Sequence, residues 1–324
     1  MKHITHIVIC LVLLFLFSIA EQNISAQDGI KNPSIPRQTL HFEHLSTEDG
    51  LSNPRVYAIY QDSEGFLWFG TDDGLNRYDG YHLTVYRHDP TNPSSVSSNT
   101  IKSIVEDSQG RLWLGTEKGL NIFNRKTGHF TRFLHDNADP HSISNNDILT
   151  IFEDSRARLW IGTYGGGLNR LVWGADEDSP PMFLHYQHQA DDPSSLGGDK
   201  VLSIQEDAEG TLWIGTFGGG LNKLIEGERE SEVTFERYQH QPDNPNSLSS
   251  DNIYKLFRDS EGMLWIGTFG SGLNKFDPHT QQFTHYRAVE DTSNSLGNDN
   301  IIEIIEDSRG TLWLGTWGGR TCPI

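Results

Sequence analysis

Histidine is a common metal ligand, and four histidines of this chain stand at one fixed spacing. His88, His135, His188 and His240 each precede an apolar residue by eight positions, and Ala288 takes the same place in a fifth segment. A metal site needs about three or four ligands that converge on one point. Each histidine belongs to a different copy of a repeat, however, so we expect the side chains to be spread apart. The sequence therefore predicts no metal site, and we expect no cofactor.

Carboxylates are the second chemically capable set. Glu106, Glu153, Glu206 and Glu306 each stand directly before an Asp. Hydrolysis of a glycosidic bond needs two carboxylates about 5–10 Å apart that flank the bond. A residue that recurs in copy after copy of a repeat meets a need that every copy has, which is packing or turn geometry. We therefore predict that these carboxylates are structural and that the chain has no catalytic residue.

Aromatic residues next to glycines form the third set, and this set differs between copies of the repeat. Tyr164, Phe217, Phe269 and Trp317 each follow a Gly-Thr pair and precede glycine. The first two copies are one residue shorter there and carry acidic residues instead, namely Asp72-Asp73 and Glu117. Glycine leaves the backbone open, and a neighbouring ring offers a flat apolar platform.

A ligand lacks the symmetry of a repeat, so its contacts should fall where the copies differ. We therefore predict a ligand-binding face on which a sugar ring or another flat ligand stacks. In the alternative, the rings pack over the boundary between neighbouring copies of the repeat, below the turn. The candidate residues of this face are Tyr164, Phe217, Phe269, Trp317, Asp72 and Glu117.

All three sets belong to one repeat, whose clearest mark is the run Leu-Trp-x-Gly-Thr. The steps between its tryptophans, from Trp68 to Trp313, are 45, 47, 53, 52 and 48 residues. A period near 50 is typical of a propeller or a solenoid.

Each of the first five units contains four strand-like runs. An alternating apolar run ends in Asp-Ser-x-Gly, with Ala157 for the Gly in the third copy and Ala208 for the Ser in the fourth. Leu-Trp-x-Gly-Thr follows, Gly-Leu-Asn opens the third run, and the fourth is rich in aromatic residues. Four antiparallel strands in each period predict an all-β propeller, with the tryptophans packed between neighbouring blades. After Trp317 the sixth unit lacks Gly-Leu-Asn, so we expect that blade to be incomplete, without its third and fourth strands.

The chain divides into three parts: a short N-terminal segment, a polar leader and the repeats. Residues 1–26 have a lysine at position 2, an apolar run over 7–20 and Ile24-Ser25-Ala26 as a cleavage site, which predicts a signal peptide. An uncleaved N-terminal anchor is the alternative. Residues 27–39 form a polar leader, and 40–324 form the propeller, whose opening run 40–45 alternates like a strand that could complete the last blade.

The formal net charge of −19 disfavours nucleic acid and anionic membranes as partners, because both attract basic surfaces. We therefore expect contact with a membrane only through an uncleaved signal or a longer parent protein. The predicted signal peptide indicates export, so we expect a periplasmic protein.

Residues 40–317 resemble the two-component regulator propeller family. The resemblance is carried by the order of the four runs and by the entry segment Thr47-Glu48-Asp49-Gly50-Leu51-Ser52-Asn53. It implies the extracytoplasmic input domain of a membrane-bound sensor histidine kinase, in a family with many hybrid sensors that respond to oligosaccharides. It also implies a kinase region that is absent here, so we expect a truncated product without enzymatic activity of its own.

The expected partner is a small-molecule or oligosaccharide ligand, with a homodimer as a further option. Two other functions remain open from the sequence. One is a propeller lyase or glycosidase, for which Asp72, Asp73 and Glu117 lie in turns of the right kind. The other is a protein-interaction scaffold.

Overall fold

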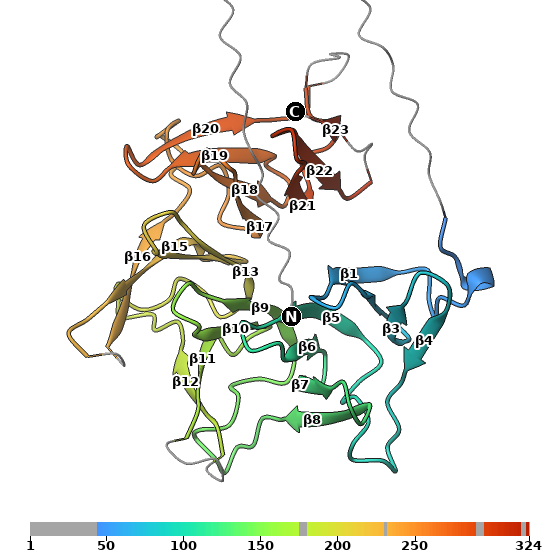
Figure 1. The fold of residues 1–324 in the computed structure, drawn as a ribbon. Helices are drawn as coiled ribbons and strands as arrows, with labels where there is room; N and C mark the ends of the chain where they lie inside the picture. Colours follow the sequence, from blue (N-terminus) through green and yellow to red (C-terminus); the bar gives the residue numbers. More distant parts are fainter. Residues whose placement is uncertain (1–43, 175–179, 230–231, 290–294, 319–321, 324) are drawn as a thin grey trace, which may run out of the picture. The chain divides into compact units, whose positions relative to one another are not determined.

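A computed structural model describes residues 44–174, 180–229, 232–289, 295–318 and 322–323 (Figure 1). The predicted signal peptide, the leader and residues 40–43 of the predicted opening strand lie outside the described residues. His44 and Leu45 are not in a strand, and a short 3₁₀ helix, η1 (Thr47–Asp49), follows them.

Six antiparallel sheets, named blades I to VI, follow one another along the described chain. Blade I contains β1 (Val56–Gln61), β2 (Leu67–Thr71), β3 (Gly74–Tyr78) and β4 (Leu83–Tyr86). Blade II contains β5 (Ile101–Glu106), β6 (Leu112–Thr116), β7 (Gly119–Asn124) and β8 (His129–Phe133). Blade III contains β9 (Ile148–Glu153), β10 (Leu159–Thr163), β11 (Leu168–Val172) and β12 (Met182–Tyr186). Blade IV contains β13 (Val201–Glu206), β14 (Leu212–Thr216), β15 (Gly220–Glu226) and β16 (Val233–Tyr238). Blade V contains β17 (Ile253–Arg258), β18 (Leu264–Thr268), β19 (Leu273–Asp277) and β20 (Gln282–Tyr286). Blade VI contains β21 (Ile301–Glu306), β22 (Leu312–Thr316) and β23 (Cys322–Pro323).

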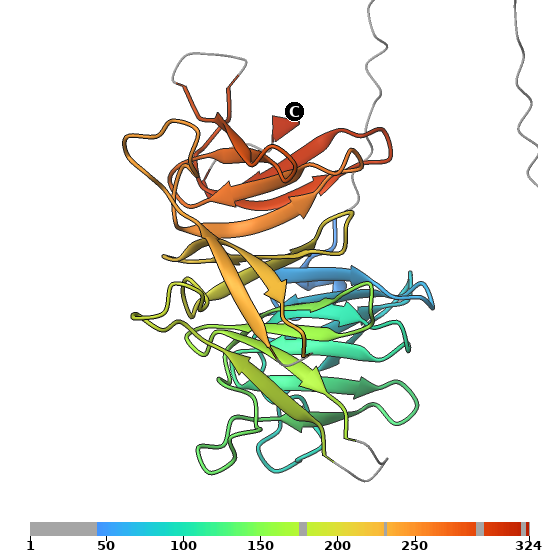
Figure 2. The same cartoon turned by 90° about the vertical axis from the view of Figure 1, so that its left-hand side faces the viewer.

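The strands of each blade pair in chain order, as the sequence predicts for propeller blades. The four strands of blade V, drawn in orange, stay together in both views (Figures 1 and 2). The first strands of successive blades contact one another, from β1 through β5, β9, β13 and β17 to β21. The predicted all-β propeller repeat is therefore confirmed.

Blade VI differs from the prediction in one respect. A two-residue third strand, β23, pairs with β22 through Trp313↔Pro323 and Leu314↔Cys322. The prediction of no third strand relied on the missing Gly-Leu-Asn motif, but strand pairing is made by backbone groups that any sequence carries. The blade has three strands among its described residues and is incomplete, as expected.

One aspartate closes the turn between the first and second strands of each blade. In blade I, Asp62 Oδ1 accepts bonds from the Glu64 and Phe66 backbone N–H groups at 3.1 and 2.9 Å. Its Oδ2 accepts the indole N–H of Trp68 at 2.7 Å. The motif Asp-Ser-x-Gly and the motif Leu-Trp-x-Gly-Thr are therefore one unit, because the carboxylate that forms the turn also orients the tryptophan.

The hydrophobic core lies between neighbouring blades. Trp68 packs in one cluster with Ile101 and Ile104 of blade II, and the equivalent tryptophans of the next four blades are buried in the same way. Trp313, in the last described blade, is half-buried. Gly70 of the repeated motif permits this close approach, because a Cβ atom there would lie 2.7 Å from the Ile101 carbonyl oxygen.

A Ser–Glu pair joins neighbouring blades on the face that carries the aspartate turns. Glu106 of blade II accepts both the backbone N–H and the hydroxyl of Ser63 in blade I, each at 2.7 Å. The same two bonds recur at three more seams, between Ser108 and Glu153, Ser155 and Glu206, and Ser260 and Glu306. Both partners differ at the seam between blades IV and V, where Ala208 takes the position of the Ser and Arg258 that of the Glu.

The double substitution Ala208→Ser with Arg258→Glu should introduce the missing pair. We expect it to raise the free energy of unfolding by about 1 kcal/mol, since a bond to a charged group at an exposed position stabilises less than a buried one. Urea denaturation of the double variant and both single variants measures the coupling between the two positions. Ser155→Ala at an intact seam provides the reference loss, and a double variant no more stable than the sum of the singles would contradict the expectation.

Candidate ligand-binding face

The turns between the second and third strands position the predicted site residues. The backbone N–H of Phe217 donates to the Lys200 carbonyl at 2.9 Å, just before the first strand of its own blade. The next residue, Gly218, donates to the Asp251 carbonyl in the link of the following blade, also at 2.9 Å. Gly218 needs its left-handed conformation, φ 91°, to make this turn. The aromatic turns and the links between blades therefore lie on the same face.

The four predicted aromatic side chains form a continuous row with two residues that sequence reasoning missed. The ring of Phe269 lies 6.4 Å from those of both Phe217 and Trp317, and stacks on Tyr254 at 6.0 Å, measured between centroids. Lys200 Nζ lies 4.6 Å from the ring centroid of Tyr164 and 5.7 Å from that of Phe217. We call these six residues the aromatic row.

Exposure of the row leaves apolar surface available to a ligand. Tyr164, Phe269 and Trp317 are 50%, 42% and 61% exposed, whereas Phe217 is half-buried. The sequence contained a signal for Lys200 as well, because the residue before the first strand varies among the blades and only blade IV has a lysine there. It is Thr100, Asp147, Lys200, Asn252 and Asn300 in blades II to VI.

The two predicted acidic residues lie in blades I and II and are held by their own blades. Asp72 accepts the hydroxyl of Tyr57 at 2.8 Å and forms an ion pair with Arg55 at 3.3 Å. Glu117 accepts the hydroxyl of Ser98 at 3.3 Å. Neither takes part in the ring contacts that define the row, so the structure brings together only the four aromatic members of the predicted set.

The histidine series stabilises the links between blades. Nδ1–H of His88 donates to the Val96 carbonyl at 2.8 Å, and His135, His188 and His240 make the same bond at the same distance. The fixed spacing of eight residues follows from this bond. Among the described residues, no group of three or more His, Cys, Asp or Glu side chains is placed to hold a metal ion.

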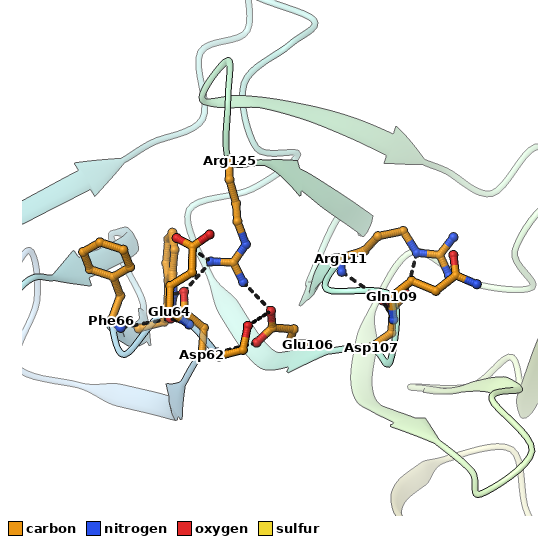
Figure 3. Close-up of polar contacts among 10 residues, drawn as sticks. Asp62, Glu64, Phe66, Glu106, Asp107, Gln109, Arg111 and Arg125 are labelled. Atoms are coloured by element: carbon orange, nitrogen blue, oxygen red, sulfur yellow. Dashed lines mark hydrogen bonds and ion pairs between the residues drawn. The ribbon is translucent and has the colours of Figure 1, made fainter. Parts of the chain in front are cut away.

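The recurrent carboxylates have structural partners, and those between blades I and II are shown in Figure 3. Arg125, in the turn between β7 and β8, points toward both Asp62 and Glu106, and its bond to Glu106 is 2.8 Å long. Burial alone would raise the pKa of Asp62, but the hydrogen bonds from Trp68 and Arg125 outweigh it and hold that pKa below its usual value. These carboxylates maintain the seam between the two blades.

Comparison with known proteins places this arrangement in a family. Six segments match the sequence model described as two component regulator propeller, namely residues 50–73, 95–118, 142–165, 195–218, 247–270 and 295–318. The chain therefore belongs to the two-component regulator propeller family.

Two relatives are much longer than this chain. Histidine kinase P4 of Formosa agariphila is 45% identical over 239 residues, which cover 74% of this chain and 17% of that protein. The crystal structure of the extracellular domain of a hybrid two component system from B. thetaiotaomicron is 28% identical, with a TM-score of 0.64. That match covers 86% of this chain and 41% of the other.

Virginiamycin B lyase from Staphylococcus aureus shares the fold alone. It is 14% identical with a TM-score of 0.57, over 82% of this chain and 78% of the lyase. Among the described residues, no helix has the length and apolar character needed to cross a membrane.

Proposed function

We propose that this chain is the ligand-sensing propeller of a two-component signal transduction system and that it acts outside the cytoplasm. The family assignment supports a sensor, and the crystal structure with TM-score 0.64 is the extracellular domain of such a system. Phosphotransfer would belong to other parts of a longer protein, since the chain spans 17% of the histidine kinase that it matches.

The aromatic row is the observation that supports a ligand. Rings in four successive turns, three of them exposed and that of Phe217 half-buried, form an apolar surface on the face where the blades differ in sequence. Sugar rings have apolar faces that stack on aromatic side chains, and binding sites commonly combine such surfaces with a few polar groups. We therefore propose that the row binds an oligosaccharide.

Binding without chemistry is favoured over an enzymatic function. The recurrent Glu106, Glu153, Glu206 and Glu306 accept hydrogen bonds across seams, and Asp72 is ion-paired. A carboxylate engaged in this way is poorly placed to transfer a proton to a substrate. The likeness to virginiamycin B lyase concerns the fold and adds no catalytic residue.

A thermal-shift screen of the purified chain against an oligosaccharide panel tests this function. A ligand at about 100 times its Kd should stabilise the folded chain by about 2.7 kcal/mol, because it binds the folded state alone. Chromatography of the same mixtures should recover the ligand unchanged. A new product would instead support the lyase or glycosidase alternative, and a panel without any stabilising member would contradict oligosaccharide sensing.

A further inference from the structure

Lys200 is held between two blades, and in the aromatic row it lies between Tyr164 and Phe217. It is the last residue before β13, and it pairs with Tyr164 of blade III in an isolated antiparallel bridge. On its other side, its carbonyl accepts the backbone N–H of Phe217. The backbone of Lys200 is therefore fixed relative to both rings that its ammonium group approaches.

The ammonium group of Lys200 has no carboxylate within ion-pair distance among the described residues. Other basic side chains at or near the start of a first strand are paired, namely Arg55 with Asp72, Lys102 with Asp147 and Lys255 with Glu303. These pairs form in a chain of net charge −19, in which carboxylates are abundant. Lys200 therefore differs from its neighbours in keeping its positive charge free.

Neighbouring carboxylates are engaged elsewhere. Asp199 Oδ1 accepts the backbone N–H of His188 at 2.7 Å, and Asp251 Oδ1 accepts that of His240 at 2.7 Å. Asp147, at the entry to blade III, lies 2.6 Å from Lys102. The positive charge on the row is therefore available to a ligand, and the half-buried position of Lys200 reduces the solvent screening of that charge.

We propose that the aromatic row selects a saccharide that carries an anionic group, either a uronic carboxylate or a sulfate ester, and that Lys200 Nζ binds this group. The proposal rests on the proposed function, in which the row binds an oligosaccharide. Lys200 Nζ lies over the rings of Tyr164 and Phe217, 4.6 and 5.7 Å from their centroids, so a sugar packed against the exposed part of the row has its substituents close to the ammonium group. The ammonium group offers three hydrogen-bond donors to such an anion.

Calorimetric titrations with three probes test the proposal. The probes are an oligogalacturonate, a sulfated galacto-oligosaccharide and the neutral galacto-oligosaccharide of the same length. We expect one of the two anionic probes to bind more tightly than the neutral one, and the probe that does so identifies the anionic group. Its affinity should also fall as the salt concentration rises, because salt screens exposed charges.

Lys200→Met keeps an apolar side chain over the rings but removes the charge. We expect this variant to bind the preferred anionic probe about tenfold to a hundredfold more weakly, and to lose much less affinity for the neutral probe. Lys200→Arg should retain most of the preference. The matched control is Lys275→Met, which removes a lysine lying 5.3 Å over the ring of Trp265 within blade V and should leave all three affinities unchanged.

The possible results distinguish failure of the role of Lys200 from failure of the proposed function. Equal affinity for the charged and neutral probes, or equal losses for both in Lys200→Met, would overturn the role of Lys200 while leaving an oligosaccharide sensor intact. Failure of all three probes to bind, together with an unresponsive thermal-shift panel, would overturn both the role of Lys200 and the proposed function.

Discussion

The substitution Asp207→Ala should lower the free energy of unfolding by about 3–5 kcal/mol. Asp207 is buried, and its Oδ2 accepts the indole N–H of Trp213 at 2.8 Å. Its Oδ1 accepts the backbone N–H groups of Glu209 and Thr211 at 3.1 and 2.8 Å. Alanine would leave the buried indole N–H without an acceptor and would also free the turn, so two structural functions are lost at once.

Urea denaturation measures this effect. Asp207→Asn should lower the free energy of unfolding less than alanine does, because its amide oxygen can still accept bonds from the turn. It should still be destabilising, since its NH₂ group cannot accept the indole N–H. The matched control for the loss of one negative charge is Asp243→Ala, at an exposed link position, which should change stability by less than about 0.5 kcal/mol. A loss below about 1 kcal/mol for Asp207→Ala would show that the Asp–Trp bond is not a main support of the blade.

The substitution Phe217→Ala should weaken oligosaccharide binding about fivefold to a hundredfold. This range assumes that a sugar stacks on the ring no better than a nucleic-acid base, at about 1–3 kcal/mol per contact. Phe217 lies between Lys200 and Phe269, so its removal interrupts the row near its middle. Its ring is half-buried, and we expect a stability loss near 1 kcal/mol, below the value for a fully buried ring.

Thermal melts of Phe217→Ala, with and without ligand, distinguish a binding residue from a packing residue. A ring that mainly fills the seam between blades would cost about 3–5 kcal/mol when removed. A drop of that size with an unchanged ligand response would reject the binding function of Phe217. The matched control is Tyr81→Ala, which removes an 87% exposed ring from the turn between β3 and β4 and should alter neither property.

The strands and their order could be predicted because their signals are local. Leu-Trp-x-Gly-Thr alternates between two faces, and the Asp-Ser-x-Gly turn is closed by bonds within five residues, as at Asp62 and Phe66. Repetition then distinguished residues that every blade needs, such as Trp68, from residues that vary, such as Phe217. The bond from the tryptophan of the second strand to the turn aspartate was not predicted, because it depends on how the two strands pair.

The tertiary structure decided which residues meet across the seams. Ser63 and Glu106 are 43 residues apart in sequence, yet they bond across a seam. Only once this contact is known does the presence of Ala208 and Arg258 at the equivalent positions show that one seam has no Ser–Glu pair. Lys200 and Tyr254 joined the aromatic row for the same reason, since links and turns of neighbouring blades come together only on folding. Local sequence therefore determined the blades, whereas contacts between blades determined the composition of the ligand-binding face.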